Sequence, residues 1–200
     1  ATVTRQHRRQ LRARAVGGVN EAREHGKLIG QRRSAIAEEP QHVAGAVKQV
    51  REAKQLGAVS VMVLGTAGDD MLDHPRLDPF YAALCEENLA LGVHVGWSCP
   101  AVNNLYSHIY PSGVIAFHVP LLMAFTALVS GGVLDRFPQL KVVFLEAGCQ
   151  WVPFIVERIH HRFKNQGSTL RKFLPQTAPI QKLPVLSYIK QGNIYFSTEV

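Results

Sequence analysis

The sequence is poor in the residues that cross-link small secreted domains or hold zinc through sulfur. It contains three cysteines, Cys85, Cys99 and Cys149, and none of them forms a CxxC pair. An odd number of cysteines in this arrangement predicts neither a disulfide framework nor a cysteine zinc site. A reducing, cytoplasmic location is therefore expected.

Long apolar runs are also scarce. Gly, Pro, Ser or His interrupts each candidate before it approaches the roughly 20 residues that a bilayer-spanning helix needs. The basic beginning of the chain is not followed by the apolar core of a signal peptide. A soluble chain without a membrane partner is expected.

Positive charge is concentrated rather than spread, although the chain carries a formal net charge of +7. Five arginines lie close to the beginning: Arg5, Arg8, Arg9, Arg12 and Arg14. Such a run could attract polyanions, but no nucleic-acid-binding motif accompanies it, so no nucleic-acid partner is expected. Residues 1–32 are predicted to be a basic, partly disordered arm and lead-in, and residues 33–200 one globular domain.

Short apolar runs rich in β-branched residues alternate with segments of helical spacing. Strands are predicted at Arg33–Ala37, Ala58–Leu64, Val93–Val95, Lys141–Glu146 and Ile194–Ser197. Helices are predicted at Pro40–Leu56, from Asp78 to Leu91 with Asp78 as N-cap, at Pro120–Val129 and at Trp151–Phe163. This alternation predicts an α/β fold with a parallel sheet, either open or closed into a barrel.

Three motifs of open-sheet enzymes are absent, namely GxGxxG, GxxxxGK[ST] and GxSxG. Their absence favours a barrel. In a barrel, functional side chains gather where the parallel strands end. Two titratable residues fall at such positions, His94 and Glu146.

His94 lies between Val93 and Val95, so its imidazole faces away from the valines near the end of an apolar strand. It is either a metal ligand or a core histidine bound to a backbone carbonyl. Glu146 ends the strand that begins at Lys141, and a buried carboxylate there needs a partner. A metal, an arginine, a proton or a backbone amide could be that partner.

The segment that follows His94 is predicted to be a long loop from Trp97 to about Gly113. It carries aromatic and hydrogen-bonding groups, among them Trp97, Asn103 and Asn104. These side chains either contact a substrate or belong to an ordinary loop. His118, just before an apolar helix, either faces a pocket or caps the first turn of that helix.

Three stretches of sequence carry a family resemblance: Leu72–Tyr81 with Leu91–Gly96, Ser130–Gly148 with Trp151–Pro153, and Ile194–Ser197. From about Arg33 to its end the chain resembles the amidohydrolase-related family, which includes aminocarboxymuconate semialdehyde decarboxylase. The resemblance implies a distorted (β/α)8 barrel with one divalent metal, usually zinc, although iron or manganese is possible. It also implies that His94 is a metal ligand.

The sequence departs from the family's pattern in three places. Glu146-Ala147-Gly148 stands where the decarboxylases have His-Gly-Gly, no His-x-His follows a first strand, and the chain stops before the family's late aspartate. The expectation is a barrel that is incomplete at both ends. A glutamate at position 146 can act as a catalytic base. The expected reaction is therefore hydrolysis of a small carbonyl or carboxylate compound by metal-activated water.

Two other functions remain open at this point. One is a non-oxidative decarboxylase of the same family, and the other is a catalytically incomplete barrel that binds a small molecule. The substrate-binding residues are predicted to be Trp97, Asn103, Asn104 and His118. A homo-oligomer is expected.

Overall fold

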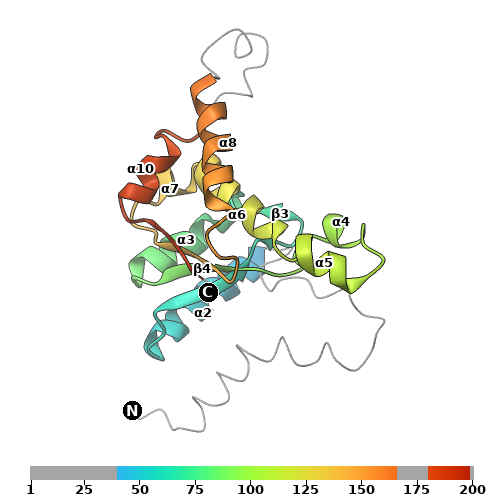
Figure 1. Cartoon of the computed structure of the whole chain (residues 1–200). Helices are drawn as coiled ribbons and strands as arrows, with labels where there is room; N and C mark the ends of the chain where they lie inside the picture. The colour runs from blue at the N-terminus through green and yellow to red at the C-terminus, as the bar shows by residue number, and fades with distance from the viewer. Residues whose placement is uncertain (1–39, 166–179, 199–200) are drawn as a thin grey trace. The chain divides into compact units, whose positions relative to one another are not determined.

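The computed structural model describes residues 40–165 and 180–198 (Figure 1). The chain divides into two units, Ala1–Arg33 and Ser34–Val200. The first unit lies outside the described residues, and so do the predicted basic arm and the predicted strand Arg33–Ala37. The description that follows concerns the second unit.

Four parallel strands form one sheet in the order β1 (Ser60–Leu64), β4 (Ala90–His94), β5 (Val142–Leu145) and β6 (Ile194–Phe196). Each strand pairs with the next strand of this sheet along the chain, so the order never reverses. An open doubly wound sheet reverses its order at a switch point, whereas the wall of a barrel does not. The predicted parallel α/β class is confirmed, with the connectivity of a barrel wall.

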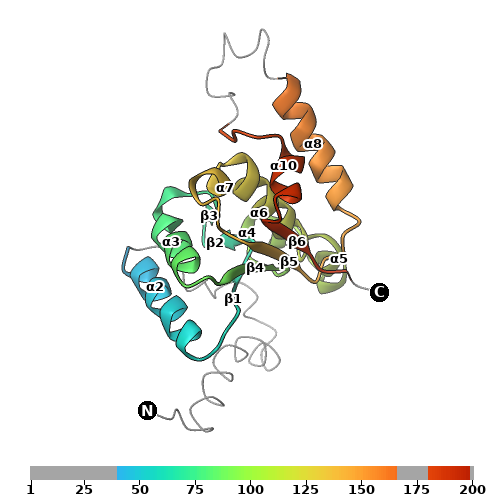
Figure 2. The same cartoon turned by 90° about the vertical axis from the view of Figure 1, so that its left-hand side faces the viewer.

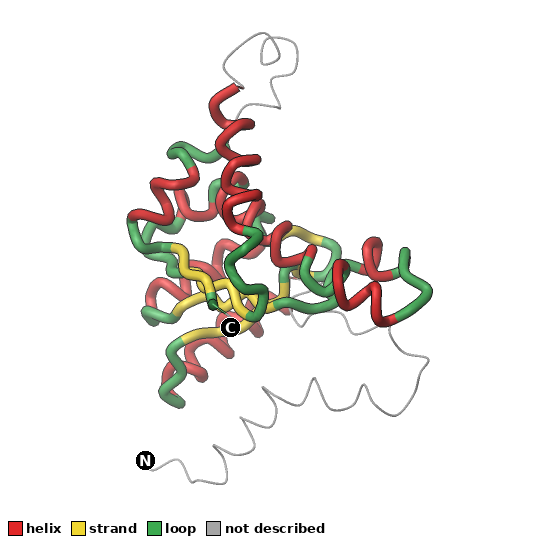
Figure 3. The backbone as a smooth tube through the Cα atoms, in the orientation of Figure 1, coloured by secondary structure: helices red, strands yellow, loops and turns green. Residues whose placement is uncertain are grey.

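Helices make the connections between these strands (Figure 2). β1 leads to β4 through α3 (Asp78–Glu86), β4 leads to β5 through α6 (Val119–Ser130), and β5 leads to β6 through α8 (Val152–Asn165) and α10 (Val185–Lys190). The remaining elements are α2 (Pro40–Gln55), β2 (Thr66–Ala67), β3 (Asp70–Met71), η2 (Pro75–Leu77), α4 (Pro100–Asn103), α5 (Ile109–Ile115) and α7 (Val133–Arg136). β2 and β3 pair in a separate antiparallel sheet. Figure 3 shows the strands together, with helices around them.

Helix α2 illustrates why the sequence folds this way. Val43, Ala46 and Val50 recur at helical spacing and are buried, so they form the apolar stripe by which α2 packs against α3. Gly57 follows in the left-handed region with φ 82° and ends the helix. The predicted helix Pro40–Leu56 is confirmed to within one residue.

The core beside the site is aromatic. Phe125 from α6 lies 5.4 Å from Phe144 of β5 and 5.5 Å from Trp151, measured between ring centroids. Phe196 of β6 stacks on Phe144 at 5.7 Å. Edge-to-face and stacked pairs at these distances are favourable beyond the area they bury. The cluster joins α6 to the last two strands.

Tyr81 is a buried polar group of α3 whose hydroxyl donates to the carbonyl oxygen of Leu72 at 2.5 Å. Burial raises the pKa of this hydroxyl well above its ordinary value, and the nearby carboxylate of Asp73 adds to the rise. The hydroxyl therefore stays protonated and acts as a donor that fixes the turn before η2.

Two local predictions are wrong. Asp78 is not the N-cap of α3, because Leu77 takes that place and the Asp78 carboxylate instead accepts hydrogen bonds from Arg136 at 3.0–3.3 Å. The segment predicted as a loop from Trp97 to Gly113 contains α4 and part of α5.

One stretch, Ile109–Ser130, is apolar and long enough to cross a membrane by length and composition, with a mean hydropathy of 1.9. The sequence-based expectation that no apolar run approaches the length of a membrane span did not account for this stretch. Half of the stretch's most apolar window is buried, and its second part is the core helix α6. The core helix of a soluble protein passes the same test, so this stretch is weak evidence for a membrane span.

Gly65 and Gly45 give a matched pair of substitutions. A Cβ at Gly65 would lie 2.1 Å from the Pro120 carbonyl oxygen, whereas a Cβ at Gly45, within α2, would meet nothing within 4 Å. We expect Gly65→Ala to lower the free energy of unfolding by about 1–3 kcal/mol through overpacking. Gly45→Ala should raise it by about 0.5–1 kcal/mol through helix propensity. Urea unfolding followed by circular dichroism measures both, and equal stabilities would contradict the close approach of β1 to α6.

Candidate active site

The candidate site lies at the edge of the sheet where the parallel strands end. Leu64, His94 and Leu145 are partners in register on β1, β4 and β5. His94 is the last residue of β4, and Glu146 directly follows β5. Parallel strands end at a common edge, so the register brings these two side chains together.

The imidazole of His94 is held in a defined orientation. Its Nδ1 lies 2.7 Å from the carbonyl oxygen of Val95. A carbonyl oxygen only accepts hydrogen bonds, so Nδ1 carries the proton and donates it. Nε2 is left to face the site, and in the neutral ring it carries the lone pair that a metal would use.

Glu146 supplies the second group. Its Oε1 lies 3.2 Å from Nε2 of His94, and its side chain is 63% exposed against 22% for His94. Its backbone has φ 60°, a left-handed conformation that non-glycine residues rarely adopt. Such residues cost on the order of 1–3 kcal/mol and cluster at functional sites. The turn after β5 therefore holds an unfavourable conformation that places a carboxylate beside His94.

Ser197 supports this turn and was not singled out from the sequence as a site residue. The backbone N–H of Glu146 donates to Ser197 Oγ at 3.0 Å, and the N–H of Ser197 donates to the Phe144 carbonyl oxygen at 2.9 Å. The sequence did contain a pattern that could have identified Ser197: it directly follows the strand β6 and therefore lies at the same edge of the sheet as His94 and Glu146.

The geometry of the pair suits two ligands of one metal. Zinc bonds to imidazole nitrogen and carboxylate oxygen are about 2.0–2.2 Å long, so two such ligands lie roughly 3.0–3.5 Å apart. The 3.2 Å separation of Nε2 and Oε1 falls in this range, and it also suits a direct ion pair. Within residues 40–165 and 180–198, no group of three His, Cys, Asp or Glu side chains could hold a metal. The pair by itself offers two donor atoms, Nε2 and Oε1.

The predicted substrate-binding residues lie on the segment after β4 and at the start of α6. The Trp97 Nε1–H donates to Ser112 Oγ at 2.8 Å, and the indole packs on Phe117 with ring centroids 4.5 Å apart. Asn103 ends α4, Asn104 follows it, and His118 precedes α6. In the described part of the chain, no recorded hydrogen bond joins these four residues to His94 or Glu146, so their role stays a prediction.

His118 does not cap α6. It occupies the N-cap position without a side-chain hydrogen bond to the first turn, so the capping alternative is wrong. Its Nδ1 is buried and has no partner among the described residues, and the same holds for Ser98 Oγ and Asn103 Oδ1. Buried polar atoms are normally paired, and nothing in the fold explains these three.

A family model described as an amidohydrolase matches residues 22–173. The chain belongs to the amidohydrolase family. The resemblance found from the sequence is thereby confirmed.

Two curated relatives of this amidohydrolase-family chain are decarboxylases. One is the decarboxylase orsB of Emericella nidulans, 28% identical over 58% of this chain and 37% of its own length. The other is the 2-amino-3-carboxymuconate-6-semialdehyde decarboxylase of Dictyostelium discoideum, 26% identical over 54% of this chain and 30% of its own length. The chain thus spans about a third of the length of these relatives.

Solved structures share the fold. A 5-carboxyvanillate decarboxylase of Novosphingobium aromaticivorans, solved with bound manganese, matches 80% of this chain and 45% of its own at TM-score 0.64 and 19% identity. A 2,6-dihydroxybenzoate decarboxylase from Rhizobium matches 80% and 49% at TM-score 0.60 and 20% identity. The predicted fold, a partial barrel of the metal-dependent hydrolase type, is confirmed.

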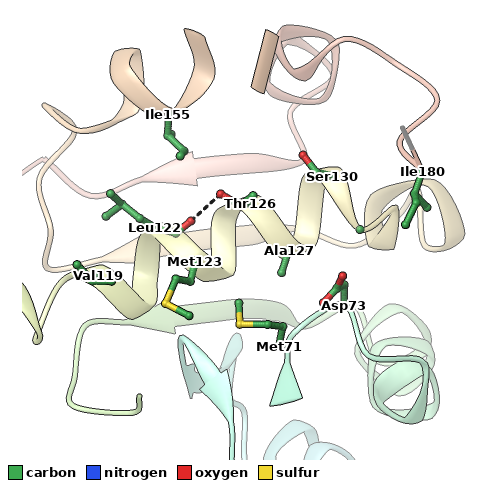
Figure 4. Close-up of a pocket in the computed structure, with 11 residues that line it drawn as sticks. Met71, Asp73, Val119, Leu122, Met123, Thr126, Ala127, Ser130, Ile155 and Ile180 are labelled. Carbon is green, nitrogen blue, oxygen red and sulfur yellow. Dashed lines mark hydrogen bonds between the residues drawn. The ribbon is translucent and has the colours of Figure 1, made fainter. Parts of the chain in front are cut away.

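A cavity of about 510 Å³ lies elsewhere, along α6 (Figure 4). Apolar side chains such as Met71, Leu122 and Ile155 line it, together with Asp73. It contains neither His94 nor Glu146. The Thr126 hydroxyl in its wall already donates to the Leu122 carbonyl oxygen at 3.0 Å. We therefore place the candidate site at the ends of the strands and not in this cavity.

The orientation of His94 leads to a metal-binding prediction. His94→Ala in the full chain should weaken Mn²⁺ or Zn²⁺ binding at least about tenfold, because an oriented ligand is lost. The far-ultraviolet circular dichroism should stay unchanged, since the ring is not part of the core cluster. His161→Ala, on the exposed side of α8, is the control and should bind metal as wild type does. Calorimetry that finds equal affinities for all three proteins would exclude His94 as a ligand.

Proposed function

We propose that this chain forms the central and C-terminal part of a metal-dependent decarboxylase that acts on a small aromatic or unsaturated carboxylate. The observation that carries the proposal is the His94–Glu146 pair at the edge where the strands end, in a chain of the amidohydrolase family. Hydrolysis was the first expectation from the sequence. The relatives, which are decarboxylases by name, favour the alternative.

The metal would be held in part by Nε2 of His94, and the Glu146 carboxyl group would lie beside the ion. A divalent ion held there would supply Lewis-acid chemistry, namely orientation of a substrate carboxylate or polarisation of a carbonyl. Zinc was expected from the sequence, and manganese is bound in one structural neighbour, so either ion fits the proposal. The chain's own contribution is orientation, because the Val95 carbonyl oxygen fixes the imidazole and Ser197 fixes the turn that carries Glu146.

Decarboxylation would require Glu146 to donate a proton. The bond between the substrate carbon and its carboxylate breaks, carbon dioxide leaves, and the electron pair that remains on carbon takes up a proton. Glu146 in its acid form would donate that proton from beside His94. A positioned proton donor of this kind accelerates reactions by roughly 10²–10⁴-fold.

Hydrolysis remains the second candidate because of the same residue. As a carboxylate, Glu146 would take a proton from the water that attacks a carbonyl, which reverses the direction of proton transfer. A glutamate in place of the decarboxylases' histidine is the observation that favours this reaction. The predicted cytoplasmic location agrees with three free cysteines but remains a prediction.

Replacing Glu146 separates the two reactions. Incubation of the metal-loaded full chain with aromatic and unsaturated carboxylates should release carbon dioxide, and Glu146→Gln should lower that turnover by roughly 10²-fold or more. Glu146→His should retain much of the decarboxylation, because imidazole can also donate a proton to carbon. Glu157→Gln, on the exposed side of α8, is the matched control.

Three outcomes would contradict the decarboxylase. Turnover of esters, amides or lactones without carbon dioxide, abolished by both Glu146→Gln and Glu146→His, would establish hydrolysis instead. Full activity of Glu146→Gln would remove Glu146 from the mechanism. Carboxylate binding without any turnover would establish a binding barrel.

A further inference from the structure

Ser197 directly follows β6 and continues the sheet by one residue. Its N–H donates to the Phe144 carbonyl oxygen at 2.9 Å. The side chain before it, Phe196, stacks on Phe144 and lies 6.0 Å from Phe125 of α6, measured between ring centroids. Successive side chains of a strand point to opposite faces of the sheet. Ser197 therefore points to the face that α6 does not cover.

His94 and Glu146 meet on this same face. The register partner of His94 is Leu145, the neighbour of Phe144 in β5, so the imidazole points away from the face of Phe144. Simple alternation would return Glu146 to the face of Phe144, but its left-handed backbone, with φ 60°, turns the carboxylate to His94 at 3.2 Å. The neighbouring strands β4, β5 and β6 (Figure 2) thus each end in one polar side chain of a single cluster.

The hydroxyl of Ser197 has a hydrogen to donate. A serine hydroxyl carries one donor and two acceptor lone pairs. Oγ accepts the N–H of Glu146 at 3.0 Å, so the hydroxyl hydrogen points in another direction. Within residues 40–165 and 180–198, no acceptor for this hydrogen is recorded. The donor is therefore available to a molecule bound beside His94 and Glu146.

The other two side chains of the cluster do not offer such a donor. Nδ1–H of His94 donates to the Val95 carbonyl oxygen, and Nε2 carries a lone pair. Glu146 as a carboxylate only accepts hydrogen bonds, and its acid form holds the single proton that the proposed reaction delivers to carbon. A substrate carboxylate also only accepts. Of the three side chains, Ser197 is the one that can bind it by donating.

We propose that the Ser197 hydroxyl donates a hydrogen bond to a carboxylate oxygen of the substrate. Ser197 then has two separate tasks, since its lone pair supports the turn that carries Glu146 and its hydrogen binds the substrate. The proposal rests on the proposed function, because it takes the substrate to be a carboxylate that lies at the ends of the strands. It concerns binding, so it is testable without turnover.

Calorimetry of benzoate binding to the Mn²⁺-loaded full chain tests the proposal. Ser197→Ala should lower the benzoate affinity roughly tenfold or more, the usual effect of losing a hydrogen bond to a charged group. Ser197→Thr keeps the hydroxyl and should bind nearly as wild type does. Ser60→Ala is the matched control, because Ser60 is an exposed serine at the beginning of β1, at the opposite end of the sheet. It should bind benzoate as wild type does.

A glycine background separates substrate contact from support of the turn. Glycine adopts positive φ readily, so in Glu146→Gly the turn no longer depends on Ser197. Adding Ser197→Ala to this background should again lower the benzoate affinity roughly tenfold, with an unchanged circular dichroism spectrum. An effect that disappears in the glycine background would overturn the proposal and would leave Ser197 as a support of the turn.

The fate of this proposal is distinguishable from that of the decarboxylase. Carbon dioxide release by wild type, together with a benzoate affinity that Ser197→Ala does not change, would overturn the substrate contact and leave the reaction standing. Benzoate binding that depends on Ser197, in a chain that releases no carbon dioxide from any carboxylate, would support the contact and contradict the reaction. A wild-type chain that does not bind benzoate would overturn the contact.

Discussion

The parallel register of β4 with β5 is the constraint on which the candidate site depends. It aligns His94 with Leu145, so the residue that ends one strand lies beside the first residue after the next. The aromatic cluster packs α6 on β5 and β6, and Ser197, directly after β6, accepts a hydrogen bond from the backbone N–H of Glu146. The 3.2 Å contact between imidazole and carboxylate follows from these packing relations.

Much of this arrangement could be predicted from the sequence because it depends on short-range patterns. The β-branched runs around Val61, Val93 and Val143 indicate buried strands, and alternation along them indicates that His94 and Glu146 project at the strand ends. The left-handed backbone at Glu146 carries no comparable signal, since glutamate does not favour it. Its support by Ser197 is a contact between residues 51 positions apart.

Other features were missed because tertiary contacts override local preference. Asp78 precedes a proline and is a residue type common at N-caps, yet its carboxylate forms an ion pair with the guanidinium of Arg136. Helix α5 escaped prediction because its large apolar residues face solvent, so no apolar stripe indicates which side packs on the fold. The four predicted substrate-binding residues follow β4 as expected, but sequence order alone cannot fix their distance from His94.

The central claim is that His94 and Glu146 act together on one bound metal. A double-mutant cycle tests it most directly, with Mn²⁺ affinity measured by calorimetry for wild type, His94→Ala, Glu146→Gln and the double variant of the full chain. Two groups that act on one ion should be coupled. Once one of them has been replaced, replacing the other should lower the Mn²⁺ affinity by a factor at least about ten times smaller than the same substitution does in wild type, a coupling free energy of about 1.4 kcal/mol. Additive losses, or no loss from either substitution, would contradict the claim.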